Sequence, residues 1–343
     1  MTFADALTAS PLLYPIALDP RTDAVRLVRL TEADYAAASF LDGRLMAPGT
    51  PSAAVPWADV RQAMAGRPAR CHFIFHISHV GSTLLSRLVG QHPALFSLRE
   101  PAVLRTLAEA HRTLGSPEAT WPPAEFEERL AAFLALWSRT FDPARTAVVK
   151  ATSFVSEMAA DLLDRVPTAR AVLMVVGPET FLQALLGGAM TDVTDQAARR
   201  LDRLHRRLGG ARWDLAGLSP GEQVAISWLC EMSALRAAAG RFPERVLWLD
   251  FDRFLADPAA SLGRVLTHFG VADDADVVRT ILAEPTMTRY AKAPAYEFDA
   301  RHREQLLRQA AEQHAAEIRK GLDWLARAAA ADAAVRDVVG GAG

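Results

Sequence analysis

Cysteine is scarce in this sequence, and its scarcity argues against two classes of protein. Only Cys71 and Cys230 occur among 343 residues, and they form no Cys-x-x-Cys pair. A disulfide-stapled secreted domain needs a larger, closely spaced set, and a cysteine zinc site needs paired cysteines. We therefore expect neither, and a reducing compartment is favoured.

Long apolar runs and an excess of charge are also missing. No segment approaches the ~18 apolar residues that cross a bilayer, and the N-terminus lacks the basic and apolar parts of a secretory signal. The formal net charge is −2, with acidic residues interleaved among the arginines. This balance gives no general case for a nucleic acid or an anionic membrane as partner. We expect a soluble, cytoplasmic protein.

The residues that are present predict an α/β protein. Half of the residues are hydrophobic, which is enough for a sizeable core. Residues 1–68 look like an N-terminal adjunct, residues 69–330 alternate between strand and helix patterns, and residues 331–343 look like a flexible tail. The alternation predicts a P-loop-like three-layer α/β/α fold with a parallel sheet of about five strands. Apolar periodicity predicts one long C-terminal helix from Arg301 to about Ala330.

The segment that follows the first strand of this domain has the layout of a phosphate site. Phe73 to Ile77 are apolar and β-prone, Ser78 to Thr83 form a turn, and apolar residues at helical spacing begin at Leu84. The N–H groups of a first helical turn have no intrahelical acceptor, and the helix dipole attracts anions there. A full Walker A loop would need Gly at 76 and Lys at 82. The chain has His76 and Ser82 there, which weakens an ATPase or kinase interpretation.

Several segments, taken in order, resemble the sulfotransferases that use 3′-phosphoadenosine 5′-phosphosulfate. Ser78-His-Val-Gly-Ser-Thr83 is similar to the family's 5′-phosphosulfate loop, Pro-(Lys/Arg)-Ser-Gly-Thr-Thr, with His79 at the basic position. The further matches are Phe96-Ser-Leu-Arg-Glu-Pro101, Val148-Val-Lys150, residues 246–258 running on to 268–271, and Arg319-Lys320-Gly321. The resemblance covers roughly residues 70 to 325.

One departure from the family pattern affects the 3′-phosphate. The family usually has Arg-Asp-Pro after its central strand and a serine a few residues on, and that Arg and Ser hold the 3′-phosphate. This chain has Val176-Gly177-Pro178, and Ala184 stands where the serine is expected. Arg319 and Lys320 fall in a predicted helix rather than a loop. Other cations hold the 3′-phosphate, the donor differs, or transferase activity is lost.

The resemblance implies a role for each matching residue. Ser78, Val80, Gly81, Ser82, Thr83 and Leu84 would hold the 5′-phosphate, and Lys292, Arg319 and Lys320 would replace the missing 3′-phosphate clamp. His79 would stabilise leaving-group charge, Lys150 would steady the sulfuryl oxygens, and Glu100 would be the base for a hydroxyl acceptor. No metal is expected. The acceptor group would be a hydroxyl or an amine of a small molecule, a glycan or a peptide, and the oligomeric state stays open.

Several alternatives compete with this interpretation. In a P-loop kinase-like enzyme, Asp250 at a strand end would hold magnesium. In an inactive sulfotransferase fold, the chain would only bind its ligand. His72, His76 and His79 suggest a metal site; 72 and 76 share a face of the strand, but His79 lies beyond the turn, which weakens this interpretation. The basic run from Arg199 to Arg207 is usual for a solvated helix face, with an acidic acceptor or a nucleotide cover as the less common role.

Overall fold

The computed structural model describes residues 3–188, 193–210, 212–289, 291 and 300–341. Its larger sheet has five strands in the order β5-β6-β4-β7-β8, and every neighbouring pair is parallel. The strands are β4 (Cys71–His76), β5 (Leu95–Arg99), β6 (Thr146–Lys150), β7 (Ala171–Val175) and β8 (Val246–Asp250). The predicted five-stranded parallel sheet is therefore confirmed, with β4 at its centre.

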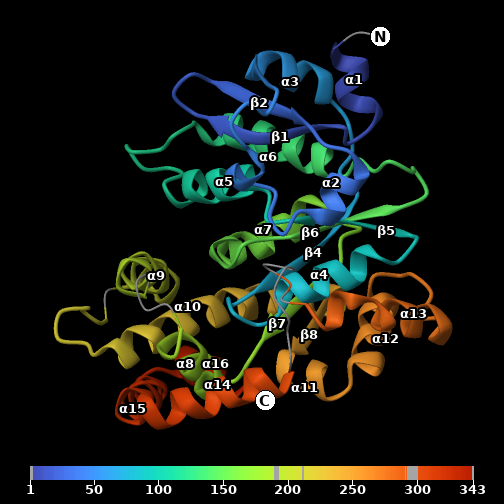
Figure 1. Cartoon of the computed structure of the whole chain (residues 1–343). Coiled ribbons are helices and arrows are strands. Elements are labelled where there is room, and N and C mark those ends of the chain that lie inside the picture. Colours follow the sequence, from blue (N-terminus) through green and yellow to red (C-terminus); the bar gives the residue numbers. More distant parts are fainter. Residues whose placement is uncertain (1–2, 189–192, 211, 290, 292–299, 342–343) are drawn as a thin grey trace.

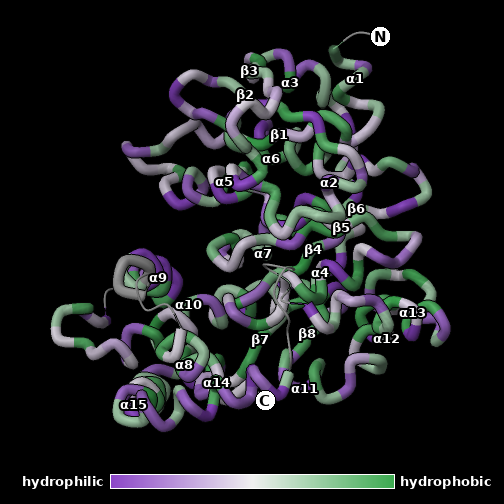
Figure 2. Tube along the Cα trace, viewed as in Figure 1, coloured by the Kyte–Doolittle hydropathy of each residue, from purple (hydrophilic) through white to green (hydrophobic). Residues whose placement is uncertain are grey.

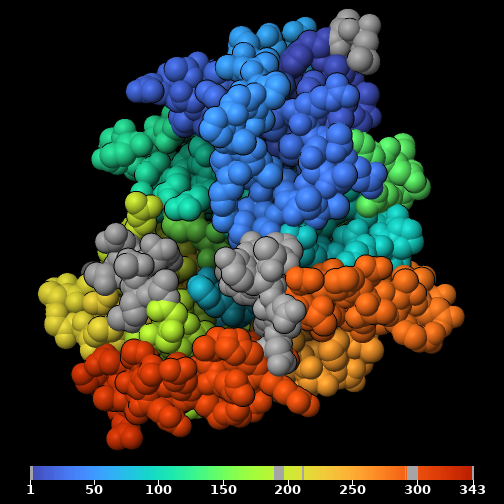
Figure 3. Space-filling view, in the orientation of Figure 1, coloured from blue at the N-terminus to red at the C-terminus, as the bar shows by residue number. Residues whose placement is uncertain are grey.

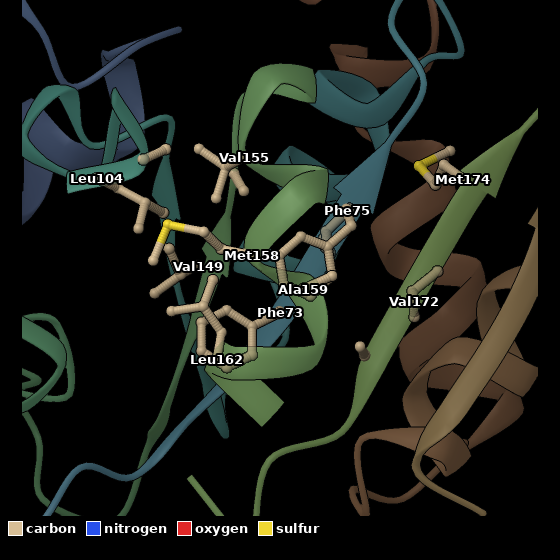
Figure 4. Close-up of a cluster of buried hydrophobic side chains, with 14 of the residues drawn as sticks. Phe73, Phe75, Leu104, Val149, Val155, Met158, Ala159, Leu162, Val172 and Met174 are labelled. Atoms are coloured by element: carbon tan, nitrogen blue, oxygen red, sulfur yellow. The ribbon is translucent and has the colours of Figure 1, made fainter. Parts of the chain in front are cut away.

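The strands of this sheet form because their side chains are buried on both faces. Every residue of β5 and β7 is buried, as expected for a parallel sheet covered by helices on each side. Figure 2 shows β4, β7 and β8 as mostly hydrophobic segments in the interior of the molecule. Phe73 and Phe75 of β4 contribute to a core cluster that also contains Met158 and Leu162 (Figure 4).

Helices cover the two faces and complete the three predicted layers. On one face α4 (Ser82–Gly90) packs on β4, β5 and β6, and α12 (Pro258–His268) packs beside it. On the other face lie η2 (Ser153–Met158), α7 (Ala159–Arg165) and α10 (Pro220–Arg241). The remaining elements of this region are α5 (Ala102–Arg112), α6 (Pro123–Trp137), α8 (Pro178–Leu186), α9 (Val193–Leu208), η4 (Pro243–Arg245), α11 (Phe251–Ala256), α13 (Ala275–Ala283) and η5 (Pro285–Met287). None of the described helices combines the length and apolar character that a bilayer crossing requires.

The N-terminal adjunct is a small antiparallel sheet at the end of the molecule opposite the C-terminal helices (Figures 1 and 3). Its elements are α1 (Phe3–Ala9), β1 (Leu13–Asp19), β2 (Ala24–Arg29), α2 (Glu32–Ala37), η1 (Gly43–Leu45), β3 (Ser52–Pro56) and α3 (Trp57–Met64). The adjunct is joined to the parallel sheet through Arg99, whose buried guanidinium donates hydrogen bonds to the carbonyls of Tyr35, Ala36 and Ala38. The C-terminal end of α2 is thereby held beside the end of β5.

The C-terminal segment is helical as predicted, but the prediction of one continuous helix is wrong. The segment divides at His314 into α14 (Ala300–Gln313) and α15 (Ala315–Ala331); both pack on α8, and α15 also packs along α10. α14 packs on α8, where a Cβ added at Gly187 would lie 2.6 Å from Ala310 Cβ. α15 packs on α10, where the Gly221 N–H donates to Glu317 Oε2 at 2.9 Å.

The tail that was predicted to be flexible contains a further helix, α16 (Ala333–Gly340). Asp332 caps it, since Oδ1 accepts from the N–H of Ala334 at 2.8 Å. Val335 and Val338 are buried, so the small residues of the tail pack against the molecule instead of fraying.

Candidate active site

A cavity of about 950 Å³ lies at the carboxyl end of the parallel sheet. Its lining comes from the turn after β4, the ends of β5 and β6, and the helices α5, α8, α9, α11 and α14, with a contribution from the adjunct near η1. This is where open α/β sheets bind ligands, because the strand order reverses on either side of a central strand.

The turn after β4 has an unusual backbone. Ser78, His79 and Gly81 have φ values of 83°, 54° and 66°. Positive φ is costly for residues other than glycine, so strain of this kind usually accompanies a functional turn. Four non-glycine residues have positive φ within the described parts of the chain, and three of them, Ser78, His79 and Glu100, line this cavity. The strained positions are therefore concentrated at one site.

Gly81 is required by the packing of the turn. A Cβ at Gly81 would lie 2.0 Å from the Phe251 ring. Phe251 opens α11 directly after β8, so the edge of the sheet supports the turn. A larger residue at position 81 would first collide with this ring, and its effect on ligand binding would not be separable from packing.

The N-terminus of α4 offers hydrogen-bond donors to the cavity. Gly81 is its N-cap and supplies no side-chain hydrogen bond, so the first-turn N–H groups have no cap. Ser82, Thr83 and Leu84 line the cavity and are buried. Thr83 is 2% exposed, and its Oγ1 has no hydrogen-bond partner among the described residues. Buried polar atoms are nearly always paired, so this hydroxyl indicates a ligand position.

Lys150 and Glu100 form an ion pair at the ends of β6 and β5. Lys150 Nζ contacts Glu100 Oε1, and the Lys150 side chain is 0% exposed. The Glu100 N–H also donates to the Lys150 carbonyl at 2.7 Å, which fixes the two residues side by side.

His76 supports this pair and the turn together. Its Nδ1 accepts a hydrogen bond from the Ser78 N–H at 3.0 Å, and its Nε2 lies 4.0 Å from Glu100 Oε1. The imidazole is buried. The sequence considered His76 only as a metal ligand, and the alternation of side chains along β4 gave no signal of this contact.

No protein-family model matches the chain, and no curated protein matches it in sequence. Sulfotransferases are among the solved structures that resemble it. The sulfotransferase domain from the Curacin biosynthetic pathway is 15% identical, has a TM-score of 0.41, and the match covers 72% of this chain and 98% of that domain. A sulfotransferase from Mycobacterium tuberculosis is 14% identical at a TM-score of 0.41, covering 72% and 78%. A mouse sulfotransferase complexed with PAP is 12% identical at a TM-score of 0.37, covering 81% and 92%.

These solved structures bear the same family name as the resemblance noted in the sequence motifs. At such low identity the likeness concerns the fold alone, and what this chain does has to be argued from its own residues.

The structure brings most of the predicted site residues together. Ser78, His79, Val80 and Gly81 line the cavity with the α4 residues described above, and so do Glu100 and Lys150. His79 is exposed in the turn. Lys292 lies outside the described residues.

Arg319 and Lys320 are not at the site. Both are exposed on α15, and Lys320 pairs with Glu317 at 2.7 Å on the same helix. Neither lines the cavity. The structure thus places both residues away from the cavity, because α15 packs along α10 and α8, and a phosphate-binding role for them stays a prediction.

A different cation, Arg303 of α14, lies near the region where the family's Arg and Ser are missing. Val176 and Gly177 are uncharged, and Ala184 lines the cavity. Arg303 also lines it, with Nη1 2.8 Å from Asp252 Oδ1 and its guanidinium carbon 5.0 Å from the centre of the Phe251 ring. Sequence spacing gave no sign of Arg303, because it reaches the site only through the packing of α14 on α8.

The basic run of α9 is largely an internal ion network instead of a solvated face. Arg200 and Arg203 bind the buried Glu231 at 2.9 and 3.0 Å, and Arg207 binds Glu157 at 2.6 Å. Burial alone would raise the pKa of Glu231, but Arg203 and Arg200 outweigh it and hold that pKa below its ordinary value. The network fixes α9 on α10, and Arg199 and Arg200 line the cavity from there.

The residues proposed for metals have other partners. Asp250 Oδ1 accepts from the Arg253 N–H at 2.9 Å as the cap of α11, and Asp250 does not line the cavity. His72 Nδ1 accepts from the Arg170 N–H at 3.1 Å, and burial lowers the pKa of His72 to about 4. Within the described ranges, no three His, Cys, Asp or Glu residues are grouped to hold a metal ion.

Proposed function

We propose that this protein transfers a sulfuryl group from 3′-phosphoadenosine 5′-phosphosulfate to a hydroxyl acceptor. The observation that carries the proposal is the Lys150–Glu100 ion pair, which lines the same cavity as the uncapped N-terminus of α4. A cation and a carboxylate beside a phosphate cradle are the groups that in-line transfer between two oxygens needs.

The N-terminus of α4 would bind the 5′-phosphate of the donor. The N–H groups of Ser82, Thr83 and Leu84 have no acceptor within the helix, and the helix dipole adds a partial positive charge. The Thr83 hydroxyl would gain the partner that it lacks. His79, exposed in the turn, would stand beside the bridging oxygen and stabilise the charge that develops there.

Lys150 and Glu100 have different roles in the proposed reaction. The bond between the sulfur and the bridging oxygen breaks, and a bond forms between the sulfur and the acceptor oxygen. Glu100 takes the acceptor proton, and the leaving phosphate keeps the electron pair of the broken bond. Lys150 compensates the negative charge on the sulfuryl oxygens in the transition state.

Arg303 would supply the charge for the 3′-phosphate. A phosphate monoester carries ~1.5 to 2 negative charges at neutral pH and cannot be buried without cations. Arg303 lies beside Phe251, which itself contacts Gly81 of the phosphate turn. Its bond with Asp252 is a partly exposed ion pair, which costs little to rearrange.

Binding and transfer can be tested separately. Calorimetry with adenosine 3′,5′-bisphosphate should show tight binding, and ATP with magnesium should bind far more weakly. Formation of labelled 4-nitrophenyl sulfate from the labelled donor and 4-nitrophenol reports transfer, and release of labelled sulfate reports transfer to water. Binding without transfer would leave a ligand-binding protein, and failure to bind the bisphosphate would overturn the donor assignment.

The Lys150→Met variant tests the transfer role directly. Removing one preorganised donor to transition-state charge should lower the transfer rate at saturating donor by ~10² to 10³. Lys320→Met is the matched control, because Lys320 is exposed on α15 and away from the cavity. An equal rate in both variants, or a change in KM alone, would contradict the role of Lys150 in the chemical step.

A further inference from the structure

The cavity is far more positive than the chain that forms it. Seven of the described residues in its lining are Lys or Arg, against a single acid, Glu100. These cations are Arg44, Arg105, Lys150, Arg199, Arg200, Arg289 and Arg303. The whole chain has a formal net charge of −2, so the positive charge is concentrated here, where low-dielectric walls focus the field on an anion.

The strand order places the cations of the lining in two regions. Arg303 lies near Phe251, beyond the carboxyl end of β8. The Lys150–Glu100 pair lies at the carboxyl ends of β6 and β5, towards the opposite edge of the sheet. Neighbouring strands are ~4.8 Å apart, so the ends of β5 and β8 are separated by roughly 19 Å. A donor nucleotide bound over β4, β7 and β8 therefore leaves the β5–β6 half of the cavity for the acceptor.

The acceptor half carries cations from three separate elements. Arg105 of α5 has its guanidinium carbon 5.9 Å from the centre of the Phe154 ring and makes no ion pair with any described residue. Arg44 of η1 stacks on Phe40, whose ring centre is also 5.8 Å from Lys150 Nζ. Arg199 of α9 completes the set. The charges of Lys150 and Glu100 neutralise each other, so the three arginines are not needed to balance this pair.

The partners of Arg44 and Arg199 do not cancel this field. Arg44 pairs with Asp42, and Arg199 pairs with Glu109 at 3.3 Å, but both arginines remain more than half exposed. Exposed ion pairs contribute only ~0 to 1 kcal/mol, so a ligand anion can exchange for Glu109 at little cost, whereas Asp42 holds Arg44 through two guanidinium nitrogens. Neither acid lines the cavity.

We propose that the acceptor is a small hydroxyl compound that carries its own carboxylate, sulfate or phosphate, and that Arg105, flanked by Arg44 and Arg199, binds this anion beside the Lys150–Glu100 pair. The inference rests on the proposed transfer, because that reaction is what assigns this half of the cavity to the acceptor. An anionic acceptor would otherwise be repelled by Glu100, and the arginines offset that repulsion.

Matched acceptor pairs test the charge requirement. The probes are 4-hydroxyphenylacetate against 4-hydroxyphenylacetamide, and glucuronate against glucose. Saturation-transfer NMR on the protein loaded with adenosine 3′,5′-bisphosphate measures binding, and labelled sulfuryl transfer measures turnover. We expect at least one anion to bind about tenfold more tightly than its neutral partner, with the preference shrinking at high salt.

Arg105→Gln should remove that preference, whereas Arg206→Gln is the matched control. Arg206 is exposed on α9, pairs with Asp202 at 3.1 Å and does not line the cavity. Equal binding of anionic and neutral probes, no binding of any probe, or an unchanged preference in Arg105→Gln would each overturn the inference. The calorimetric affinity for adenosine 3′,5′-bisphosphate distinguishes these outcomes from failure of the donor assignment, since Arg105 lies outside the nucleotide half.

Discussion

At the scale of single residues, the buried Thr83 hydroxyl is a group that a bound ligand would supply with a hydrogen-bond partner. It is buried at the start of α4 without a hydrogen-bond partner among the described residues, although Ser86 one turn later bonds to Ser97 at 2.6 Å. A buried polar atom without a partner destabilises a protein, and one that awaits a ligand gains its hydrogen bond on binding. Stability and binding should therefore respond to different residues of one helix.

The Thr83→Val variant separates these two effects. Valine keeps the shape of threonine, so the free energy of unfolding should stay the same or rise. The affinity for adenosine 3′,5′-bisphosphate should fall about 10- to 100-fold, the value of a hydrogen bond to a charged group. Ser86→Ala should do the reverse, with a loss of about 1 kcal/mol in stability and unchanged affinity. Calorimetry and urea unfolding measure both, and unchanged affinity in Thr83→Val would dismiss the hydroxyl as a ligand contact.

At the scale of elements, α9 owes its position to buried charges instead of an apolar face. Glu231 of α10 is 0% exposed and binds Arg200 and Arg203 of α9, while Ser156 of η2 also donates to its carboxylate. A buried carboxylate is tolerated only with such partners, and losing one partner leaves uncompensated charge.

Glu231→Gln should lower the free energy of unfolding at neutral pH by about 3 to 5 kcal/mol. Because the folded pKa of Glu231 lies below its ordinary value of 4.5, its stabilising contribution is present above about pH 4.5 and is lost as the pH falls through the folded pKa. The variant should lack this acid-dependent loss. Urea unfolding at several pH values measures both effects. Glu109→Gln is a suitable control, because Glu109 pairs with Arg199 at the surface. Its free energy of unfolding should change by less than about 1 kcal/mol.

The sequence correctly predicted the elements whose characteristic residues lie within one short stretch of the chain. The strand, turn and helix around Gly81 have an apolar run, a glycine and helical periodicity within a short stretch, and the structure has all three. β3 was missed because four of its five residues are exposed and it lacks an apolar face. Arg303 and Arg105 were missed as site residues because tertiary packing alone brings them to the cavity. Lys292 remains a prediction from family spacing.

At the scale of the whole molecule, the C-terminus contributes stability at a distance from the cavity. Val335 and Val338 of α16 are buried, and Arg212 pairs with Asp332 at its start. None of these residues lines the cavity.

Deleting residues 333–343 should therefore lower the free energy of unfolding by about 3 kcal/mol, at ~1.5 kcal/mol for each buried valine. Affinity for adenosine 3′,5′-bisphosphate should be unchanged at a temperature where the shortened chain is folded. Removing residues 341–343 alone, which leaves α16 complete, is the control. Loss of nucleotide affinity in the shorter chain, measured by calorimetry, would mean that the C-terminus shapes the site.

The contact between Gly81 and Phe251 has a consequence for how the chain matures during synthesis. The phosphate turn leaves the ribosome early, but the ring that supports it belongs to α11, and Arg303 follows later still. Parallel strands far apart in sequence pair slowly. A nascent chain released before residue 251 would hold the turn without its support, so we expect nucleotide binding to appear only once β8 and α11 have emerged and docked.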